Sequence, residues 1–218
     1  MNGAKFRARY GVVGLSIVLK DFVVEGLNEA GLSAGLFYFP HYGNYPVYDA
    51  KQNTRTVADL QLVAWMLSQF STIEEIKAAM QDIRVVSVDT TGASSTVHWR
   101  IGDANGRQVV LEFVDGVPCF YENEIGVLTN SPGFPWQMTN LNNYVNLYPG
   151  GAEAHQLGGV TIFPFGAGSG FQGIPGDVTP PSRFVRAAFY KATAPQCATA
   201  YDAVLLSLIH ILTLPTKA

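Results

Sequence analysis

Charged side chains, cysteines and long hydrophobic runs are all scarce in this sequence of 218 residues. Only 14% of the residues are charged, the net charge is -3, and no basic stripe is present to neutralise phosphates, so we expect no nucleic-acid partner. Two cysteines, Cys119 and Cys197, are too few for a disulfide framework. The apolar run Ala203–Leu212 is too short to span a bilayer, so we expect no membrane partner.

Several catalytic and cofactor motifs are missing as well. No G-x-S-x-G elbow lies between a strand and a helix, and no secretory signal opens the chain. A literal G-x-G-x-x-G covers Gly168–Gly173, but Pro175 and Gly176 follow where a dinucleotide site needs a helix. The histidines are scattered without metal-ligand spacing: His41, His98, His155 and His210. We therefore expect no cofactor, and nucleotide binding at the glycine-rich loop is kept only as a rival interpretation.

The composition that is present indicates a globular protein rich in strands. Hydrophobic residues make up 48% of the chain, which is enough for one domain with a substantial core. The 22 glycines and 12 prolines favour strands joined by tight turns over a helical bundle.

Hydrophobic patterning predicts the strands and turns. A buried strand is predicted over 10–19, an extended segment over 22–25 and a turn over 26–31. Further strands are predicted over 32–39, 83–88, 97–101, 108–114, 117–121 and 125–128, with an extended segment over 160–165. Asn105-Gly106 and Asp115-Gly116 are two-residue hairpin turn signals.

Segments with helical periodicity lie between blocks of these predicted strands. Thr56 is predicted to cap a helix, and Thr72 with Glu75 forms a capping box before a second one. Two later helices are predicted over 136–148 and 182–194. Blocks of strands followed by blocks of helices indicate an α+β fold, which we predict to be a single domain over 1–218.

Three polar or aromatic residues near the predicted ends of elements are candidates for a site. Asn130 follows a predicted strand, where its amide could donate to a developing oxyanion, although local sequence favours an Asx turn. Arg183 lies in a predicted first helical turn, where a cation opposes the helix dipole, and the alternative is a surface arginine. Tyr38 precedes Phe39-Pro40 at a strand end, and the alternative is a core residue. His98 and Cys119 lie in predicted strands and receive no catalytic role.

Three blocks of sequence resemble those of the choloylglycine hydrolase and penicillin V acylase family. Their order and spacing match from about Tyr10 to Ala203. The blocks are Glu25–Leu32 with Phe39-Pro40, then Gly126–Pro132 with Asn140–Tyr144, and finally Gly166–Gly170, Gly173–Asp177 and Pro180–Ala187.

This resemblance implies an αββα sandwich of the N-terminal-nucleophile hydrolase type. It also implies hydrolysis of a small-molecule linear amide, such as a conjugated bile salt or penicillin V, by an N-terminal cysteine, and in relatives a homotetramer. A free α-amino group can take the thiol proton, which makes such a cysteine chemically competent. Acyl-homoserine lactones are a further substrate of some family members.

Residue by residue, the resemblance assigns three positions. Asn130 matches the oxyanion-hole asparagine, and Arg183 matches the active-site arginine that holds the thiol in its reactive form. Tyr38 matches the position bordering the oxyanion hole, which is asparagine in many bile salt hydrolases and tyrosine in typical penicillin V acylases. Tyrosine therefore tilts the expected substrate toward the acylases.

The sequence departs from the family at both ends. The family's cysteine belongs upstream of Met1, and residues 204–218 form either a core helix or an aberrant tail, so we expect a partial domain without turnover by itself. The alternative is a non-catalytic relative that binds acyl or steroid ligands, or an inactive fragment. Whether the protein acts in the cytoplasm or the periplasm stays open.

Overall fold

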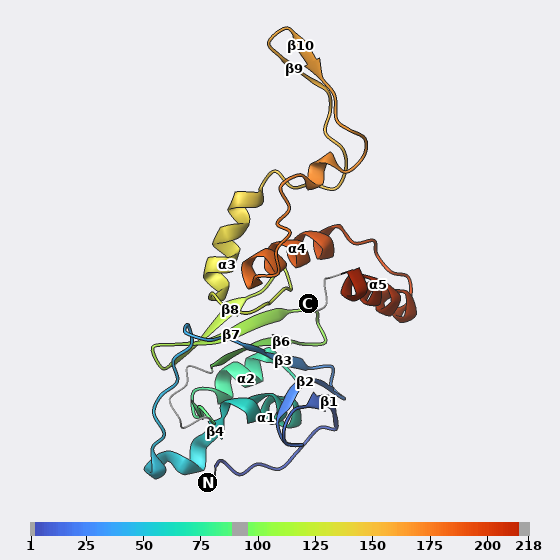
Figure 1. Ribbon diagram of the computed structural model, residues 1–218. Helices are drawn as coiled ribbons and strands as arrows, with labels where there is room; N and C mark the ends of the chain where they lie inside the picture. Colours follow the sequence, from blue (N-terminus) through green and yellow to red (C-terminus); the bar gives the residue numbers. More distant parts are fainter. Residues whose placement is uncertain (1–2, 89–95, 214–218) are drawn as a thin grey trace. The chain divides into compact units, whose positions relative to one another are not determined.

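The computed structural model describes residues 3–88 and 96–213, with side chains described as far as residue 206. Its contacts divide the chain into two compact units, Met1–Asn140 and Leu141–Ala218. The single domain over 1–218 stays a prediction, and residues 214–218 of the predicted tail lie outside the described part. Strands and helices are segregated along the chain, so the α+β class is confirmed (Figure 1).

The first unit contains a six-stranded sheet in the order β1-β2-β3-β6-β7-β8. Every neighbouring pair in it is antiparallel. The strands are β1 (Val12–Ser16), β2 (Val23–Asn28), β3 (Ser33–Tyr38), β6 (Val97–Gly102), β7 (Gln108–Val114) and β8 (Val117–Glu122). Both predicted signals lie in hairpin turns, but only Asp115-Gly116 forms a two-residue loop, whereas residues 103–107 join β6 to β7. Asp115 and Gly116 have φ values of 52° and 77°, the left-handed conformation that a two-residue loop between β7 and β8 requires.

Two helices and a short parallel strand pair accompany the sheet. The helices are α1 (Leu62–Gln69) and α2 (Ile73–Ala79), which lie together on one side of the sheet (Figure 1). The strand pair is β4 (Thr56–Ala58) with β5 (Arg84–Val86), and the short 3-10 helices η1 (Ala50–Arg55) and η2 (Asp59–Gln61) flank β4.

The hydrophobic core of this unit follows from the two-residue period of the strands. Alternate residues of β6 and β7 join the helices in the core: Val97, Trp99, Ile101, Val109, Leu111 and Phe113, together with Leu62, Met66, Ile73 and Ile76. Because side chains alternate along a strand, His98 and Glu112 face the opposite side of the sheet. The register that pairs Trp99 with Leu111 places these two polar residues across from each other.

The N-terminal strand is present but not buried as predicted. All five residues of β1 are exposed, and the side chains of Val13 and Leu15 are 71% and 68% accessible. The prediction of a buried strand over 10–19 is wrong because β1 is the edge strand and pairs only with β2. A hydrophobic run alone does not tell a strand in the middle of a sheet from one at its edge.

The turn predicted over 26–31 begins later than expected. Gly26 to Asn28 belong to β2, and the chain reverses after Asn28, whose Oδ1 accepts from the amides of Ala30 and Leu32 at 3.1 and 2.9 Å. Gly26 is needed for close approach in this sheet, because a Cβ there would lie 2.8 Å from the carbonyl oxygen of Val13.

Two further element predictions are wrong. Thr56 begins β4 instead of capping a helix, and α1 begins only at Leu62. No strand forms over 125–128, because the Asn123 side chain folds that segment into a turn. Its Oδ1 accepts from Gly126 N at 2.9 Å and its Nδ2 donates to Val127 O at 3.1 Å.

The helix predicted over 136–148 is divided between the two units. It forms α3 (Phe134–Asn140) in the first unit and the 3-10 helix η3 (Leu141–Tyr144) in the second. The second unit continues with β9 (His155–Leu157), β10 (Val160–Ile162), η4 (Ser169–Phe171), α4 (Pro180–Thr193) and α5 (Ala200–Thr213). The helix predicted over 182–194 is α4, which starts two residues earlier because proline suits a first helical turn.

The glycine-rich motif does not form a phosphate-binding loop. Gly168 has a left-handed φ of 92° and leads into only a single 3-10 turn, η4. None of the helices within residues 3–88 and 96–213 is long and apolar enough to cross a membrane.

The capping box generates a stability prediction. The Thr72 side chain accepts from the Glu75 amide, and the Glu75 side chain accepts from the amides of Ser71 and Thr72. Thr72→Ala should lower the free energy of unfolding by about 1 kcal/mol, because one helical N–H loses its partner. Urea unfolding followed by tryptophan fluorescence reports on this unit, which contains all three tryptophans. Thr54→Ala, at an exposed position in η1, is the matched control, and an equal loss in both variants would contradict the prediction.

Candidate functional site

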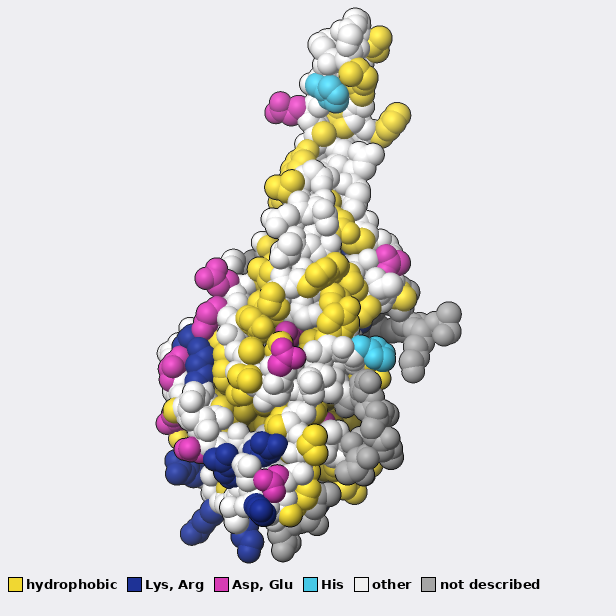
Figure 2. Space-filling model, turned by 90° about the vertical axis from the view of Figure 1, so that its left-hand side faces the viewer, with side chains coloured by type: hydrophobic (Ala, Val, Ile, Leu, Met, Phe, Trp, Pro, Cys, Tyr) yellow, Lys and Arg dark blue, Asp and Glu magenta, His cyan; other side chains and the backbone are white. Residues whose placement is uncertain are grey.

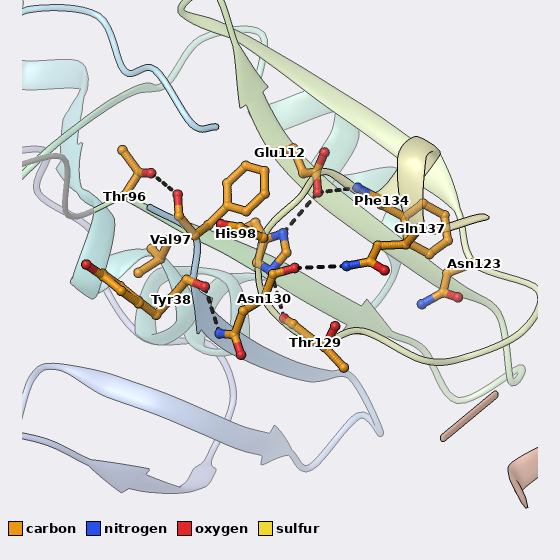
Figure 3. Close-up of polar contacts among 12 residues, drawn as sticks. Tyr38, Thr96, Val97, His98, Glu112, Asn123, Thr129, Asn130, Phe134 and Gln137 are labelled. Carbon is orange, nitrogen blue, oxygen red and sulfur yellow. Dashed lines mark hydrogen bonds and ion pairs between the residues drawn. The ribbon is translucent and has the colours of Figure 1, made fainter. Parts of the chain in front are cut away.

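Asn130 and Tyr38, two of the three predicted site residues, lie side by side in the first unit. The Asn130 Nδ2 donates to the backbone carbonyl of Tyr38 at 2.7 Å across 92 positions of sequence (Figure 3). Tyr38 is the last residue of β3, and Asn130 lies in the loop between β8 and α3, not at the strand end that the sequence predicted. This contact reaches far beyond a local Asx turn, so tertiary structure sets the orientation of the amide.

The loop around Asn130 is held from several directions. Thr129 O accepts from His98 Nε2 at 2.9 Å, and the carbonyl of Asn130 accepts from Gln137 Nε2 at 3.4 Å. The Ser131 hydroxyl donates to Pro40 O at 2.9 Å, two residues beyond Tyr38. Three consecutive residues, 129 to 131, are therefore hydrogen-bonded to β6, α3 and the segment that follows β3.

A buried polar pair lies beneath this loop. His98 and Glu112 are almost fully buried, and His98 Nδ1 lies 2.9 Å from Glu112 Oε1 (Figure 3). The same carboxylate oxygen accepts from the backbone N–H of Phe134, the first residue of α3, at 2.8 Å. Phe39 stacks on the imidazole, with ring centroids 4.2 Å apart and planes at 9°. The sequence placed His98 in a strand but identified no partner for it.

The side chain of Tyr38 points away from the core. It is 55% accessible, so the alternative that Tyr38 is a core residue is wrong. Its backbone carbonyl orients Asn130, while its phenol is available to touch a bound molecule. The backbone of Tyr38 therefore orients Asn130, while its side chain faces solvent.

An open pocket of about 550 Å³ adjoins the buried pair. It shares Phe39 and Glu112 with the site, and other side chains lining it are Tyr42, Tyr121, Pro132 and Trp136. Figure 2 shows hydrophobic side chains among polar ones on the face in view, and lysine and arginine side chains in the lower part of that view. A mainly apolar wall beside a polar loop suits an organic group better than a free ion.

Arg183 lies in the second unit, in the first turn of α4, as predicted. Its backbone N–H donates to Thr179 O and its Nε donates to Val178 O, both at 3.0 Å. Burial lowers the pKa of the Arg183 guanidinium, and the positive charge of Arg186 lowers it further. The Arg183 side chain is thus half-buried and lies near a like charge.

Asp177 organises the start of the same helix. Its carboxylate accepts from the Ser182 hydroxyl at 2.6 Å and from the Thr179 hydroxyl and N–H at 2.5 and 2.9 Å. These hydrogen bonds, first that of Ser182, lower the pKa of Asp177 to about 2. Arg186 Nη1 donates to the carbonyls of Pro175 and Asp177, which fixes the loop before α4.

The two cysteines are free thiols. Each makes a weak contact to a backbone carbonyl two residues earlier, and the Cys119 thiol also forms a side-chain hydrogen bond with Tyr121. Across residues 3–88 and 96–206, no group of histidine, cysteine, aspartate and glutamate side chains could hold a metal ion.

Sequence and structure comparisons find consistent relatives. Residues 1–216 match the model of the linear amide C–N hydrolases, choloylglycine hydrolase family. The bile salt hydrolase/transferase of Clostridium perfringens is 34% identical over 194 residues, which cover 87% of this chain and 59% of that relative. The chain therefore spans about three fifths of the length of the curated relative it matches.

Solved structures agree with the sequence match. A variant of conjugated bile acid hydrolase from Clostridium perfringens superposes with a TM-score of 0.82 at 31% identity, covering 98% of this chain and 66% of that one. Penicillin V acylase from Agrobacterium tumefaciens gives 0.75 at 25% identity, covering 99% and 60%. The mixed α+β fold thus matches part of both chains.

The Asp177 cluster predicts a pH dependence. The pKa of Asp177 is about 2 in the folded chain and 3.8 ordinarily, so its contacts contribute stability above pH 3.8 that is lost as the pH falls through about 2. Ser182→Ala should raise the pKa toward the ordinary value, because it removes the largest cause of the shift. Carbon-detected NMR titration of the carboxyl checks this, with Ser16→Ala in β1 as the control. An ordinary midpoint in the unsubstituted chain would contradict the assignment.

Proposed function

The chain belongs to the choloylglycine hydrolase family of linear amide C–N hydrolases, and on that premise we propose that it is part of an enzyme that hydrolyses small-molecule amides. The substrates we propose are conjugated bile salts or penicillin V-like acyl amides. The observation that carries the proposal is the Asn130 side-chain amide, oriented by the carbonyl of Tyr38 in a loop held by buried residues.

The chemistry we propose follows from the family resemblance. An N-terminal cysteine thiolate attacks the amide carbonyl, the C–N bond breaks to release the amine, and water then releases the acid from the thioester. The carbonyl oxygen gains negative charge during each attack. The side-chain amide of an asparagine is a hydrogen-bond donor, and that of Asn130 is held in place by the Tyr38 carbonyl, so it is chemically suited to donate to that oxyanion.

Arg183 supplies the cation in this scheme. A guanidinium placed near a thiol favours its deprotonated form, which is the nucleophile. Its lowered pKa is consistent with a partly desolvated position, and a guanidinium stays charged even so. The first turn of α4 gives it a fixed backbone anchor through Thr179.

The complete fold in this proposal is an αββα sandwich. The first unit supplies one sheet with α1 and α2 on one face, and His98 and Glu112 face the opposite side. A second sheet would pack against that opposite face and shield the site from solvent. The exposed apolar side chains of β1 are consistent with additional packing partners.

Asn130→Ala tests the catalytic role directly. The protein encoded by the complete reading frame that contains this sequence is assayed. The assays measure release of glycine from glycocholate and of the β-lactam nucleus from penicillin V. We expect turnover to fall by about a hundredfold or more, because one oxyanion donor is lost. Asn105→Ala, in the exposed β6–β7 turn, is the matched control.

The results separate the enzyme from the alternative family member. Turnover that is unchanged by Asn130→Ala would remove this residue from the mechanism. Saturable binding of glycocholate without cleavage, in a gene product whose upstream reading frame encodes no cysteine at a mature N-terminus, would instead identify a non-catalytic acyl or steroid binder.

Tyr38→Asn tests the proposed substrate preference. Tyr38 is exposed and its backbone carbonyl accepts from the Asn130 amide, and the family resemblance associates tyrosine here with penicillin V acylases. The substitution should raise the ratio of glycocholate to penicillin V cleavage, because it changes a contact surface but keeps the backbone carbonyl that orients Asn130. Steady-state kcat/KM for both substrates measures this ratio. Tyr48→Asn, at a half-exposed position, should leave the ratio unchanged.

A further inference from the structure

We propose that His98 and Glu112 form a buried imidazolium–carboxylate pair that positions Asn130. The inference rests on the proposed role of Asn130 as an oxyanion donor. Glu112 contributes to the wall of the pocket, but it and His98 are at most 2% accessible and lie beneath the loop, so neither is placed to touch the substrate. They act through the backbone of the loop that carries Asn130, and they are therefore positioning residues.

The protonation state follows from what each ring nitrogen faces. His98 Nε2 lies 2.9 Å from the carbonyl of Thr129, and a carbonyl can only accept. His98 Nδ1 lies 2.9 Å from Glu112 Oε1, an oxygen that also accepts the N–H of Phe134. Both nitrogens therefore donate, which makes the ring a cation, and the carboxylate balances its charge inside the protein.

The pair clamps the loop at both ends. His98 binds the carbonyl of Thr129, the residue before Asn130, and Glu112 binds the N–H of Phe134, four residues after it (Figure 3). Because the two side chains come from adjacent strands in the middle of the sheet, the distance between the clamped ends is fixed by the β6–β7 register. The loop between them has little freedom to turn Asn130 away.

The pair also contacts the acceptor side of the Asn130 hydrogen bond. Phe39 stacks on the imidazole at 4.2 Å, and Phe39 directly follows Tyr38, whose carbonyl receives the Asn130 amide. A cation packed against an aromatic face is attracted to it. The His98 ring thus holds Asn130 in place through Thr129, and holds Tyr38, whose carbonyl accepts from Asn130, through Phe39.

The hydrophobic core of the unit does not depend on this pair. That core lies on the helix side of the sheet and is built from Trp99, Leu111 and their neighbours, while His98 and Glu112 face away from it. A glutamate and a histidine cost free energy to bury, so their presence at these two positions points to a role that an apolar pair would not fill. Orienting a polar loop is such a role.

The first experiment needs no substitution. The chain is labelled with nitrogen-15 in histidine, and one-bond nitrogen–hydrogen couplings of the rings are recorded near neutral pH. We expect both ring nitrogens of His98 to carry hydrogen, assigned by loss of the signals in His98→Gln. Exposed His155 is the internal reference. A hydrogen missing from either nitrogen of His98 would overturn the ion pair.

The second experiment measures positioning without requiring turnover. Glu112→Gln keeps the size of the side chain and one acceptor oxygen but removes the charge, and His98→Gln cannot bridge both partners. In both variants the side-chain NH₂ of Asn130 should exchange with water about tenfold faster, while core amides of α1 keep their protection. Glu124→Gln and His155→Gln, at exposed positions, are the matched controls.

These measurements separate positioning from the proposed chemistry. Unchanged exchange at Asn130 in both variants, or loss of protection throughout the core, would overturn the positioning role. In a gene product that turns over, Glu112→Gln should lower kcat about tenfold with KM within about twofold, because only the donor is misplaced. A gene product without turnover would contradict the proposed function, and the exchange of the Asn130 amide would still decide the positioning role.

Discussion

The two-residue period of the β-strands is the constraint on which both the core and the candidate site depend. Successive side chains of β6 go to opposite faces, so Trp99 packs with the helices while its neighbour His98 faces the polar loop. A register shift of one residue would exchange the two and bury the polar imidazole in an apolar core. The packing of the core therefore fixes the geometry of the site, although no core side chain touches Asn130.

Local sequence was sufficient for the elements whose determinants are local. The capping box of α2 and the β7–β8 turn were predicted correctly, because capping hydrogen bonds and left-handed turn residues act over two to four positions. The segment over 125–128 was predicted wrongly for a related reason. Its apolar residues suit a strand, but the Asn123 side chain offers the backbone a competing set of hydrogen bonds.

The sequence predicted some residues of the candidate site but not the residues that hold them in place. Asn130 and Tyr38 were identified through resemblance to a family, and the structure brings them into contact. The partners that hold them were missed, because His98, Glu112 and Thr129 are separated by 14 and 17 positions and meet only through strand pairing and a loop. A histidine in a strand with an acidic residue on the next strand is a detectable pattern once the register is known. The sequence alone does not supply that register.

An oxyanion donor is effective only if it is oriented before the charge develops, since reorientation during the reaction would cost the stabilisation it provides. The contacts that orient Asn130 come from β3, β6, β7 and α3, all within one compact unit. None of them involves a thiol or an α-amino group. In the proposed site, the part that carries Asn130 can thus be formed independently of the nucleophile, and the loop around Asn130 can be well ordered whether or not the site is catalytically complete.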